Sequence, residues 1–409
     1  MRSVKRGKSV IKKVYTGVLP AGYFKNKSEN IENTPTFAQL TTLKIGGAIK
    51  KYVEVNNEED FINVVKQADS NAQKLLVIGA GSNIVPNDDC FDGVVVRSVQ
   101  NGIKILHDSL CAGVVLEVEP GTAWDDLVSF TVANKIVGLE SLSGIPGTVG
   151  ACPVQNIGAY GYEVAQFISK VITFDRKTCQ HKTFMASELE FEYRNSILKK
   201  SRMEINPNTN MLYGPTGRYI VLKVEFHLKY SDLSMPVKYK DVAEFLGCEI
   251  GQRFELEKVR EAVLTIRNKK ATCLDPKNLN TQSVGSYFTN PIVKDDIANK
   301  LGENIPIFDC VNYGNLSVQS LSVENEKVEG VKKVSAAKLI ENAGFSRGYG
   351  DKNAACLSDH HVLVITNRGN AKARDIKNLA TQIIQSVKNK YGIEPVSYTH
   401  LTLPTKRIV

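Results

Sequence analysis

The sequence has few of the features that mark exported, disulfide-bonded or metal-binding proteins. Its eight cysteines are scattered with no Cys-x-x-Cys pair, and its six histidines show no ligand spacing. This pattern fits reduced thiols in a reducing compartment better than disulfides or zinc. No stretch approaches the roughly 18 consecutive apolar residues of a membrane span, and the N-terminus lacks the apolar run of a secretory signal. We therefore expect a cytoplasmic protein without a metal site or membrane association.

Acidic residues are absent up to Lys27, whereas eight lysines and arginines occur there. The formal net charge of the whole chain is +9, so the remainder carries only about +1. A basic arm can bind phosphate polymers nonspecifically. Because residues 1–36 show little apolar periodicity, we favour a disordered, solvated leader and expect no specific nucleic-acid partner.

From Phe37 onward, predicted strands alternate with predicted helices. After Asn57, a helix cap, apolar residues recur at helical spacing, and Thr122 is predicted to open a second helix. Later apolar spacing predicts helices near 259–266, 336–340 and 376–387. The predicted strands are residues 52–55, 75–78, 94–96, 114–118, 171–174, 219–228 and 361–366. This alternation favours an α/β or α+β fold, and 409 residues suggest about two to three domains.

Two glycine-rich segments could bind a phosphorylated ligand. The first follows a predicted strand and comprises Gly79, Ala80, Gly81, Ser82 and Asn83. Glycines let the backbone approach a phosphate closely, although a plain tight turn explains this segment equally well. A Rossmann fingerprint is excluded, because the third glycine would fall at Ile84 and Pro86 prevents a helix there.

The second segment is residues 141–161, and its last eighteen residues contain five glycines interleaved with Thr, Gln and Asn. Such a chain can lie flat against a polar ligand and offer its amides as donors. The alternative is a long irregular surface loop. Loops of that length inside compact domains are uncommon unless they are functional, so we favour ligand binding.

Two further segments are informative only together with the two glycine-rich segments. They are Glu192-Tyr193-Arg194-Asn195-Ser196 and Gly285-Ser286-Tyr287-Phe288-Thr289-Asn290-Pro291. By itself, Arg194 could be an ordinary surface charge and Ser286 a turn residue. No Gly-x-Ser-x-Gly motif surrounds Ser286, so a hydrolase nucleophile is not expected.

Taken together, the four segments resemble the UDP-N-acetylenolpyruvoylglucosamine reductase (MurB) family over roughly residues 37–394. The family has a Gly-x-Gly-Ser-Asn loop, an Ile-Pro-Gly…Gln-Asn-Ile-Gly-Ala-Tyr-Gly segment, a Tyr-Arg-x-Ser turn and a Gly-Ser-x-Phe-x-Asn-Pro loop, in that order. The resemblance implies a two-subdomain FAD-binding module of the PCMH type, followed by a smaller α/β substrate-binding domain. It also implies NADPH-dependent reduction of UDP-N-acetyl-enolpyruvoylglucosamine to UDP-N-acetylmuramate through FAD, in peptidoglycan precursor synthesis.

The resemblance divides the chain and assigns its site residues. It implies a leader (1–36), an FAD-binding domain (37–230, with subdomains of about 37–100 and 101–230), a C-terminal domain (236–394) and a tail of foreign appearance (395–409). Arg194 would polarise the substrate carboxylate and enolate, and Ser286 would protonate the enol carbon. The FAD-binding residues implied, besides 79–83, are Ser143, Gly144, Ile145, Pro146, Gly147, Thr148, Gly150, Asn156, Gly158, Ala159 and Gly161.

The UDP-sugar would be held by residues outside the glycine-rich segments. Tyr239 resembles the substrate-gripping tyrosine of the family's larger subtype, and Asn290 resembles a group that binds the diphosphate. A lysine of the same role is Lys270 or Lys269, because Thr272 and Cys273 look like a short insertion. The expected partners are the UDP-sugar and NADPH, and the expected state is a monomer.

One departure concerns the family's Leu-Glu-Pro-Glu-Val sequence, whose second glutamate acts with the serine. This chain reads Glu394-Pro395-Val396-Ser397 instead, so the catalytic glutamate is missing. The alternative is that Glu394 or another carboxylate fills its place. Two other functions stay open: a flavin oxidase that shares the cofactor module, and a nonenzymatic nucleotide-sugar or nucleic-acid binder. Flavin absorbance at about 450 nm would exclude the nonenzymatic binder.

Overall fold

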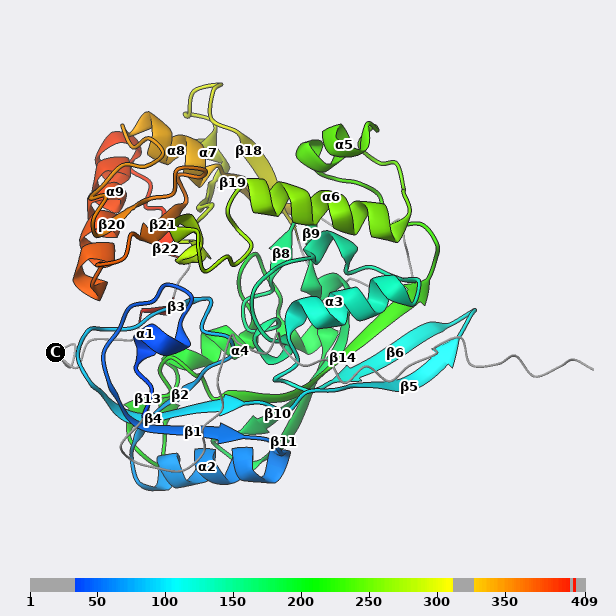
Figure 1. The fold of residues 1–409 in the computed structure, drawn as a ribbon, viewed down its shortest axis with the longest axis vertical. Coiled ribbons are helices and arrows are strands. Elements are labelled where there is room, and N and C mark those ends of the chain that lie inside the picture. The colour runs from blue at the N-terminus through cyan, green and yellow to red at the C-terminus, as the bar shows by residue number, and fades with distance from the viewer. Residues whose placement is uncertain (1–33, 312–326, 398–399, 402–409) are drawn as a thin grey trace, which may run out of the picture.

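The computed structural model describes residues 34–311, 327–397 and 400–401 (Figure 1). Residues 1–33 of the predicted leader, and residues 398–399 and 402–409 of the predicted tail, lie outside the described residues. The first sheet of the described chain is parallel and has three strands in the order β1-β4-β2. These strands are β1 (Ile49–Val55), β4 (Phe91–Ser98) and β2 (Lys74–Val77).

Helix α2 (Glu58–Ser70) connects β1 to β2 and forms where the apolar spacing predicts it (Figure 1). It buries Phe61, Val65 and Ala68 in one core with the sheet. The Asn57 side chain accepts a hydrogen bond from the Asp60 amide at 2.8 Å. This bond satisfies one of the unpaired amides at the start of the helix, so Asn57 is the predicted cap.

A larger antiparallel sheet follows in the order β11-β10-β14-β6-β5, with β7 paired to β14. Helix α3 (Trp124–Ala133) packs against it: the Trp124 ring lies 6.2 Å from that of Phe226 in β14, and its indole donates to Leu142 O at 2.9 Å. The strands are β5 (Ile103–Ser109), β6 (Gly113–Val118), β7 (Ile136–Val137), β10 (Ile168–Asp175), β11 (Gln180–Met185) and β14 (Tyr219–Tyr230).

Short elements connect these two sheets and carry the glycine-rich segments. Strand β3 forms directly after residues 79–83, at the place where Pro86 predicts that no helix begins. The short elements are α1 (Phe37–Leu40), β3 (Ile84–Val85), η2 (Glu140–Leu142), η3 (Val149–Ala151), β8 (Gly158–Ala159), β9 (Tyr162–Glu163), η4 (Val164–Gln166), η5 (Ala186–Leu189), α4 (Ile197–Lys200), η6 (Ser201–Met203), β12 (Ile205–Asn206) and β13 (Met211–Leu212).

The region after residue 236 has two separate cores. Helices α5 (Lys240–Leu246) and α6 (Leu256–Lys269) pack on each other, and α6 also packs on α3 (Figure 1). Arg260 of α6 forms a two-pronged ion pair with Asp125 of α3, both contacts at 2.7 Å. The predicted C-terminal domain therefore contains one helical pair anchored to α3 and a second body with its own core.

That second body contains two antiparallel sheets, β15-β21-β20 and β17-β19-β18, covered by helices α8 and α9 (Figure 1). Strand β21 begins at Val364, three residues later than the sequence predicts. The elements are η7 (Leu279–Thr281), β15 (Ser283–Ser286), β16 (Phe288–Thr289), β17 (Ile292–Lys294), α7 (Asp295–Ala298), β18 (Ile307–Val311), β19 (Lys327–Val334), α8 (Ala336–Asn342), β20 (Ala355–Leu357), β21 (Val364–Asn367), α9 (Ala373–Tyr391), β22 (Val396–Ser397) and β23 (His400–Leu401).

The segment after α1 joins this second body to the first glycine-rich loop. The Thr42 hydroxyl donates to Ser283 O at 2.6 Å, while the Thr42 amide donates to Gly81 O at 3.1 Å. Leu43 and Ile45 are buried in the core of the second body. A single short segment thus places the strand that carries Ser286 beside residues 79–83.

Within the described residues, no helix is both long and apolar enough to cross a membrane. The same part of the chain has no group of three or more His, Cys, Asp or Glu side chains arranged to hold a metal ion.

Candidate active site

A cavity of about 370 Å³ lies where the parallel sheet, the glycine-rich segments and the C-terminal body meet. Its volume is in the range of sites for small molecules and cofactors. All four segments singled out in the sequence contribute to its wall, from residues 79–84, 145–159, 193–194 and 284–290. Segments separated by as much as 200 residues in the chain are therefore brought to one place.

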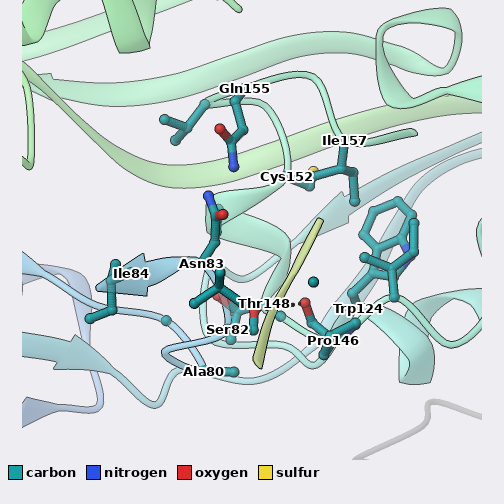
Figure 2. Close-up of a pocket in the computed structure, with 18 of the residues that line it drawn as sticks. Ala80, Ser82, Asn83, Ile84, Trp124, Pro146, Thr148, Cys152, Gln155 and Ile157 are labelled. Atoms are coloured by element: carbon teal, nitrogen blue, oxygen red, sulfur yellow. Dashed lines mark hydrogen bonds between the residues drawn. The ribbon is translucent and has the colours of Figure 1, made fainter. Parts of the chain in front are cut away.

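The first loop has its shape because both glycines are tightly enclosed. A Cβ added to Gly79 would lie 2.5 Å from Thr148 Oγ1, and one added to Gly81, which has φ of +65°, would lie 2.1 Å from Leu40 O. No L side chain fits at either position. Ser82 Oγ donates to Pro146 O at 2.8 Å, which locks this loop against the second glycine-rich segment (Figure 2).

The second segment divides into residues that line the cavity and residues that support it. Those that line it are Ile145, Pro146, Gly147, Thr148, Gly150, Gly158 and Ala159. The other predicted residues of this segment, which do not line it, are Ser143, Gly144, Asn156 and Gly161. Ser143 Oγ donates to Glu140 O at 2.6 Å, and the Gly144 amide donates to Asp125 at 2.7 Å. Asn156 is fully buried and donates to Glu163 at 2.5 Å.

The cavity wall has the chemistry that a flavin dinucleotide requires. The side-chain oxygens of Asn83 and Gln155 are buried without a hydrogen-bond partner, and the two amides point toward one another in Figure 2. Buried polar atoms usually have a partner, so these two are available to a ligand. The described lining includes three arginines and no Asp or Glu, which favours an anionic group such as a diphosphate. The residues therefore fit FAD.

Arg194 is held firmly at the wall. Its Nη2 donates to Gly158 O at 2.7 Å, and its Nη1 lies 3.1 Å from both Asn156 O and Glu163 Oε1. The side chains of Arg194 and Glu163 are only 18% and 12% exposed. The guanidinium consequently has one orientation before any ligand binds, which is what stabilisation of a developing anion requires.

Ser286 lies at the end of β15 and is exposed. The next residues, Tyr287 and Phe288, are 1% exposed and anchor the strand in the core of the C-terminal body. The described residues provide no hydrogen-bond partner for the Ser286 hydroxyl. Asn290 also lines the cavity, but its Oδ1 accepts a hydrogen bond from the Ala336 amide at 2.9 Å, at the start of α8.

Tyr239 and Lys270 do not line the cavity, but they lie together outside it. The Tyr239 ring packs edge-to-face on Tyr160 at 5.4 Å and is 44% exposed. Lys270 Nζ lies 5.9 Å from the Tyr239 ring centre and pairs with Asp241. Lys269 instead lies over the Phe245 ring, so Lys270 is the lysine that shares a site with Tyr239. The substrate-binding roles of Tyr239, Lys270 and Asn290 stay predictions.

Glu394 does not approach Ser286. Its carboxylate pairs with Lys388 at 2.8 Å, its side chain is 57% exposed, and it is not part of the cavity wall. The backbone that follows does pass beside the site, because β22 pairs with β16 in the register Phe288↔Ser397 and Thr289↔Val396. That segment therefore lies beside β16, which follows Ser286 in the chain, whereas the Glu394 carboxylate is paired with Lys388.

The cavity also includes residues that the sequence did not single out. Arg202, Thr216 and Arg267 all contribute to the wall. Burial lowers the pKa of Arg202 to about 10, which leaves the guanidinium charged at neutral pH. Arg202 and Thr216 lie in a stretch without apolar periodicity, so no sequence signal distinguishes them. Arg267 follows the buried Ile266 in α6, and apart from this neighbour no sequence signal marks Arg267 as a site residue.

Cys152 lines the cavity as well and is 1% exposed. Burial raises its pKa well above the usual value for a thiol. Because the thiolate is the reactive form of cysteine, this residue is poorly suited to a covalent link with a flavin.

Known proteins resemble this chain over most of its length. The model of an FAD-binding domain matches residues 49–174, and the model of the UDP-N-acetylenolpyruvoylglucosamine reductase C-terminal domain matches residues 275–396. The UDP-N-acetylenolpyruvoylglucosamine reductase of Cutibacterium acnes is 38% identical over 364 residues, covering 88% of this chain and 87% of that protein. The enzyme of that name from Streptomyces avermitilis is 37% identical over 365 residues, covering 88% and 93%.

The crystal structure of UDP-N-acetylenolpyruvylglucosamine reductase (MurB) from Thermus caldophilus superposes with a TM-score of 0.53 at 21% identity. The superposition covers 88% of this chain and 96% of that one. It confirms the fold that the sequence predicts, with mixed helices and sheets in an FAD-binding module followed by a C-terminal domain. By these matches over most of its length, the chain belongs to the UDP-N-acetylenolpyruvoylglucosamine reductase (MurB) family.

Proposed function

We propose that this protein reduces UDP-N-acetyl-enolpyruvoylglucosamine to UDP-N-acetylmuramate, with NADPH as the reductant and bound FAD as the cofactor. This reaction is a step in peptidoglycan precursor synthesis. The observation that carries the proposal is the composition of one cavity wall, which brings together both glycine-rich segments, Arg194 and Ser286. Family membership supports the same reaction.

The glycine-rich segments hold the cofactor. The backbone amides of residues 79–83 would bind the diphosphate, and residues 145–148, 150 and 158–159 would contact the remainder. Asn83 and Gln155 supply side-chain polar atoms that otherwise lack partners. When bound there, FAD would supply hydride-transfer chemistry between NADPH and the vinyl group of the substrate.

Arg194 binds the carboxylate of the enolpyruvyl group. Negative charge grows on this carboxylate and on the adjacent carbon as the double bond is reduced. A guanidinium that is already fixed by Gly158 and Glu163 stabilises that charge more in the transition state than in the ground state. The charge is stabilised without reorganisation of the protein at the moment of reaction.

Ser286 supplies the proton to the carbon adjacent to the carboxylate. A neutral serine is a weak acid, so this step requires close approach to the developing carbanion. The exposed hydroxyl at the end of β15 can make that approach. Tyr239 and Lys270 hold the uridine diphosphate end outside the cavity, and Asn290 contacts it from the C-terminal body.

We extend the proposal to the organisation and location of the protein. Residues 1–36 form a leader, residues 37–230 the FAD-binding domain in two subdomains, residues 236–394 the substrate-binding domain, and residues 395–409 a non-native tail. The protein is a cytoplasmic monomer without a specific nucleic-acid partner. It serves cell-wall biogenesis, and thereby cell shape and cell division.

An anaerobic experiment in two stages tests the reaction. The purified protein should be yellow, NADPH should bleach the flavin, and subsequent addition of UDP-N-acetyl-enolpyruvoylglucosamine should restore the colour. Each stage isolates one half-reaction, because oxygen is excluded. Flavin that NADPH bleaches but that only oxygen restores would contradict the reductase and favour the oxidase alternative.

A further inference from the structure

The backbone at Arg194 adopts a conformation that the chain must hold in place. Its φ is +57°, in the left-handed region that side chains other than glycine seldom occupy. The turn is closed by two main-chain hydrogen bonds between Glu192 and Asn195, at 3.1 and 3.2 Å. This conformation directs the guanidinium into the cavity wall, so anything that stabilises the turn also aims Arg194.

Lys199 is the side chain that reaches back to this turn. Its ammonium donates a hydrogen bond to Arg194 O at 3.0 Å, across five residues of chain. Helix α4, which carries it, is itself anchored: Ser196 caps the helix and donates from Oγ to Val154 O at 2.6 Å. Lys199 therefore connects the left-handed residue to a helix fixed on the second glycine-rich segment.

We propose that Lys199 is a positioning residue for the reduction, acting through Arg194 by holding its main-chain carbonyl and so the direction of its guanidinium. This inference rests on the proposed function. It assigns Lys199 no contact with substrate or cofactor, since Lys199 does not belong to the cavity wall. Glu163 fixes the far end of the Arg194 side chain, and Lys199 fixes the near end.

The surroundings of Lys199 give this role a pH signature. Burial, together with the positive charges of Arg202 and Arg194, lowers the pKa of Lys199 to about 8. The hydrogen bond from a charged ammonium is stronger than that from a neutral amine. The bond should therefore be strongest below pH about 8 and should weaken as the pH rises through that value.

The neighbouring Lys200 provides a matched control. It lies on the same short helix, but its ammonium pairs with the exposed carboxylates of Glu190 at 3.1 Å and Glu192 at 2.8 Å. Surface pairs of this kind contribute little to stability. Replacing Lys200 removes the same charge and the same side-chain length without touching the Arg194 carbonyl.

The test compares Lys199→Met, Lys199→Arg and Lys200→Met in the full-length holoprotein. We expect Lys199→Met to keep its flavin and its reduction by NADPH, and to lower the kcat of sugar-driven reoxidation by about 10- to 100-fold, the scale of a misplaced catalytic group. KM for the sugar nucleotide should change less. Lys199→Arg should restore most of the rate, and Lys200→Met should match the unaltered protein.

The pH profile is the second measurement, and it decides the case even if Lys199→Met does not fold. The unaltered protein should lose reoxidation rate as the pH rises through about 8, and Lys199→Arg should not, because arginine stays charged there. Equal rates in Lys199→Met and Lys200→Met would overturn the role of Lys199, and so would an alkaline loss of rate in Lys199→Arg that matches that of the unaltered protein. Either result would leave the proposed function intact. No reoxidation by the sugar in the unaltered protein would instead refute the proposed function.

Discussion

Arg194 and Ser286 line the same cavity, but the two regions of the chain hold them in opposite ways. In the FAD-binding region, Arg194 is fixed by two main-chain oxygens and by Glu163. In the C-terminal body, Ser286 is exposed, and the described residues offer its hydroxyl no partner. The proposed charge-stabilising group is thus preorganised, whereas the proposed proton donor depends on what comes to lie beside it.

The two regions also differ in how the cavity wall is built. The FAD-binding side is interlocked, since Ser82 Oγ donates to Pro146 O at 2.8 Å and the Trp124 amide donates to Gly147 O at 3.0 Å. The C-terminal side meets it through a short segment, in which the Thr42 hydroxyl donates to Ser283 O and Leu43 and Ile45 are buried in the C-terminal core. We therefore expect changes on the first side to abolish cofactor binding and changes on the second side to affect only the substrate step.

The largest expected effect is loss of the cofactor in Gly147→Val. Gly147 has φ of +148°, and the only atom of the described residues within 4 Å of an added Cβ is Ser82 Oγ at 3.6 Å, on the first glycine-rich loop. A branched side chain would strain the turn and occupy the space of the ligand. The purified variant should lack the flavin spectrum. Gly251→Val is the control, because Gly251 also has positive φ, of +98°, but lies outside the cavity wall.

Normal flavin content in Gly147→Val would show that the second glycine-rich segment does not bind the cofactor. It would also contradict the expectation that changes on the FAD-binding side abolish cofactor binding. Loss of flavin in Gly251→Val as well would show that any strained glycine is sufficient, which would also contradict a local effect. Only loss in the first variant and retention in the second support the assignment.

The next effect concerns Ser286→Ala. Loss of a positioned general acid typically slows a reaction by about 10²- to 10⁴-fold. NADPH should still reduce the flavin at the normal rate, because Ser286 is needed only when the substrate carbon receives its proton. Rapid-mixing measurements of the two half-reactions separate these steps. Equal slowing of both would make Ser286 a structural residue of β15 instead.

The third prediction concerns the missing carboxylate. Replacing residues 395–409 with a sequence that restores Leu-Glu-Pro-Glu-Val should accelerate sugar-driven reoxidation, by an amount on the order of 3–5 kcal/mol in barrier height. The reason is the pairing of β22 with β16, which places this segment beside the strand that begins two residues after Ser286. The matched control has glutamine at the second glutamate. Similar rates in the glutamate and glutamine versions would contradict a missing acid.

These contrasts show which parts of the site could be predicted from sequence. The Asn57 cap and the buried face of α2 both arise from residues close together in one helix. Both were predicted because the signal and its cause lie within a few residues. The edge strands β5 and β11 were not predicted, since most of their side chains are exposed and show no alternation of buried apolar residues.

Contacts between residues far apart in the chain could not be predicted from the sequence. The bond from Thr42 to Ser283 spans 241 positions, and nothing local to either residue indicates the other. The same limit applies to Arg202 and Arg267, which reach the cavity from elements far apart in the chain. It also applies to the packing of α6 on α3, which includes the Arg260–Asp125 pair. The family resemblance supplied the roles of Arg194 and Ser286, which their own surroundings in the sequence do not reveal.

The smallest expected effect is that of Glu163→Gln, which tests how far the fixed state of Arg194 matters. Two consequences oppose each other. Loss of the carboxylate frees one end of the guanidinium, which lies 3.1 Å away, but it also removes a negative charge that competes with the substrate carboxylate. Gly158 O and Asn156 O still hold Arg194, so we expect the loss of positioning to prevail only modestly. One charged hydrogen bond is worth about 1.5 kcal/mol at the lower end of its range, so the kcat of reoxidation should fall by roughly 10-fold.

Flavin content should be unchanged, and Glu190→Gln, which removes an exposed carboxylate paired with Lys200 at 3.1 Å, serves as the control. A faster reaction in Glu163→Gln would mean that Glu163 attenuates the charge of Arg194 more than it aims it, and the contrast between a fixed arginine and a loosely held serine would then no longer explain the site.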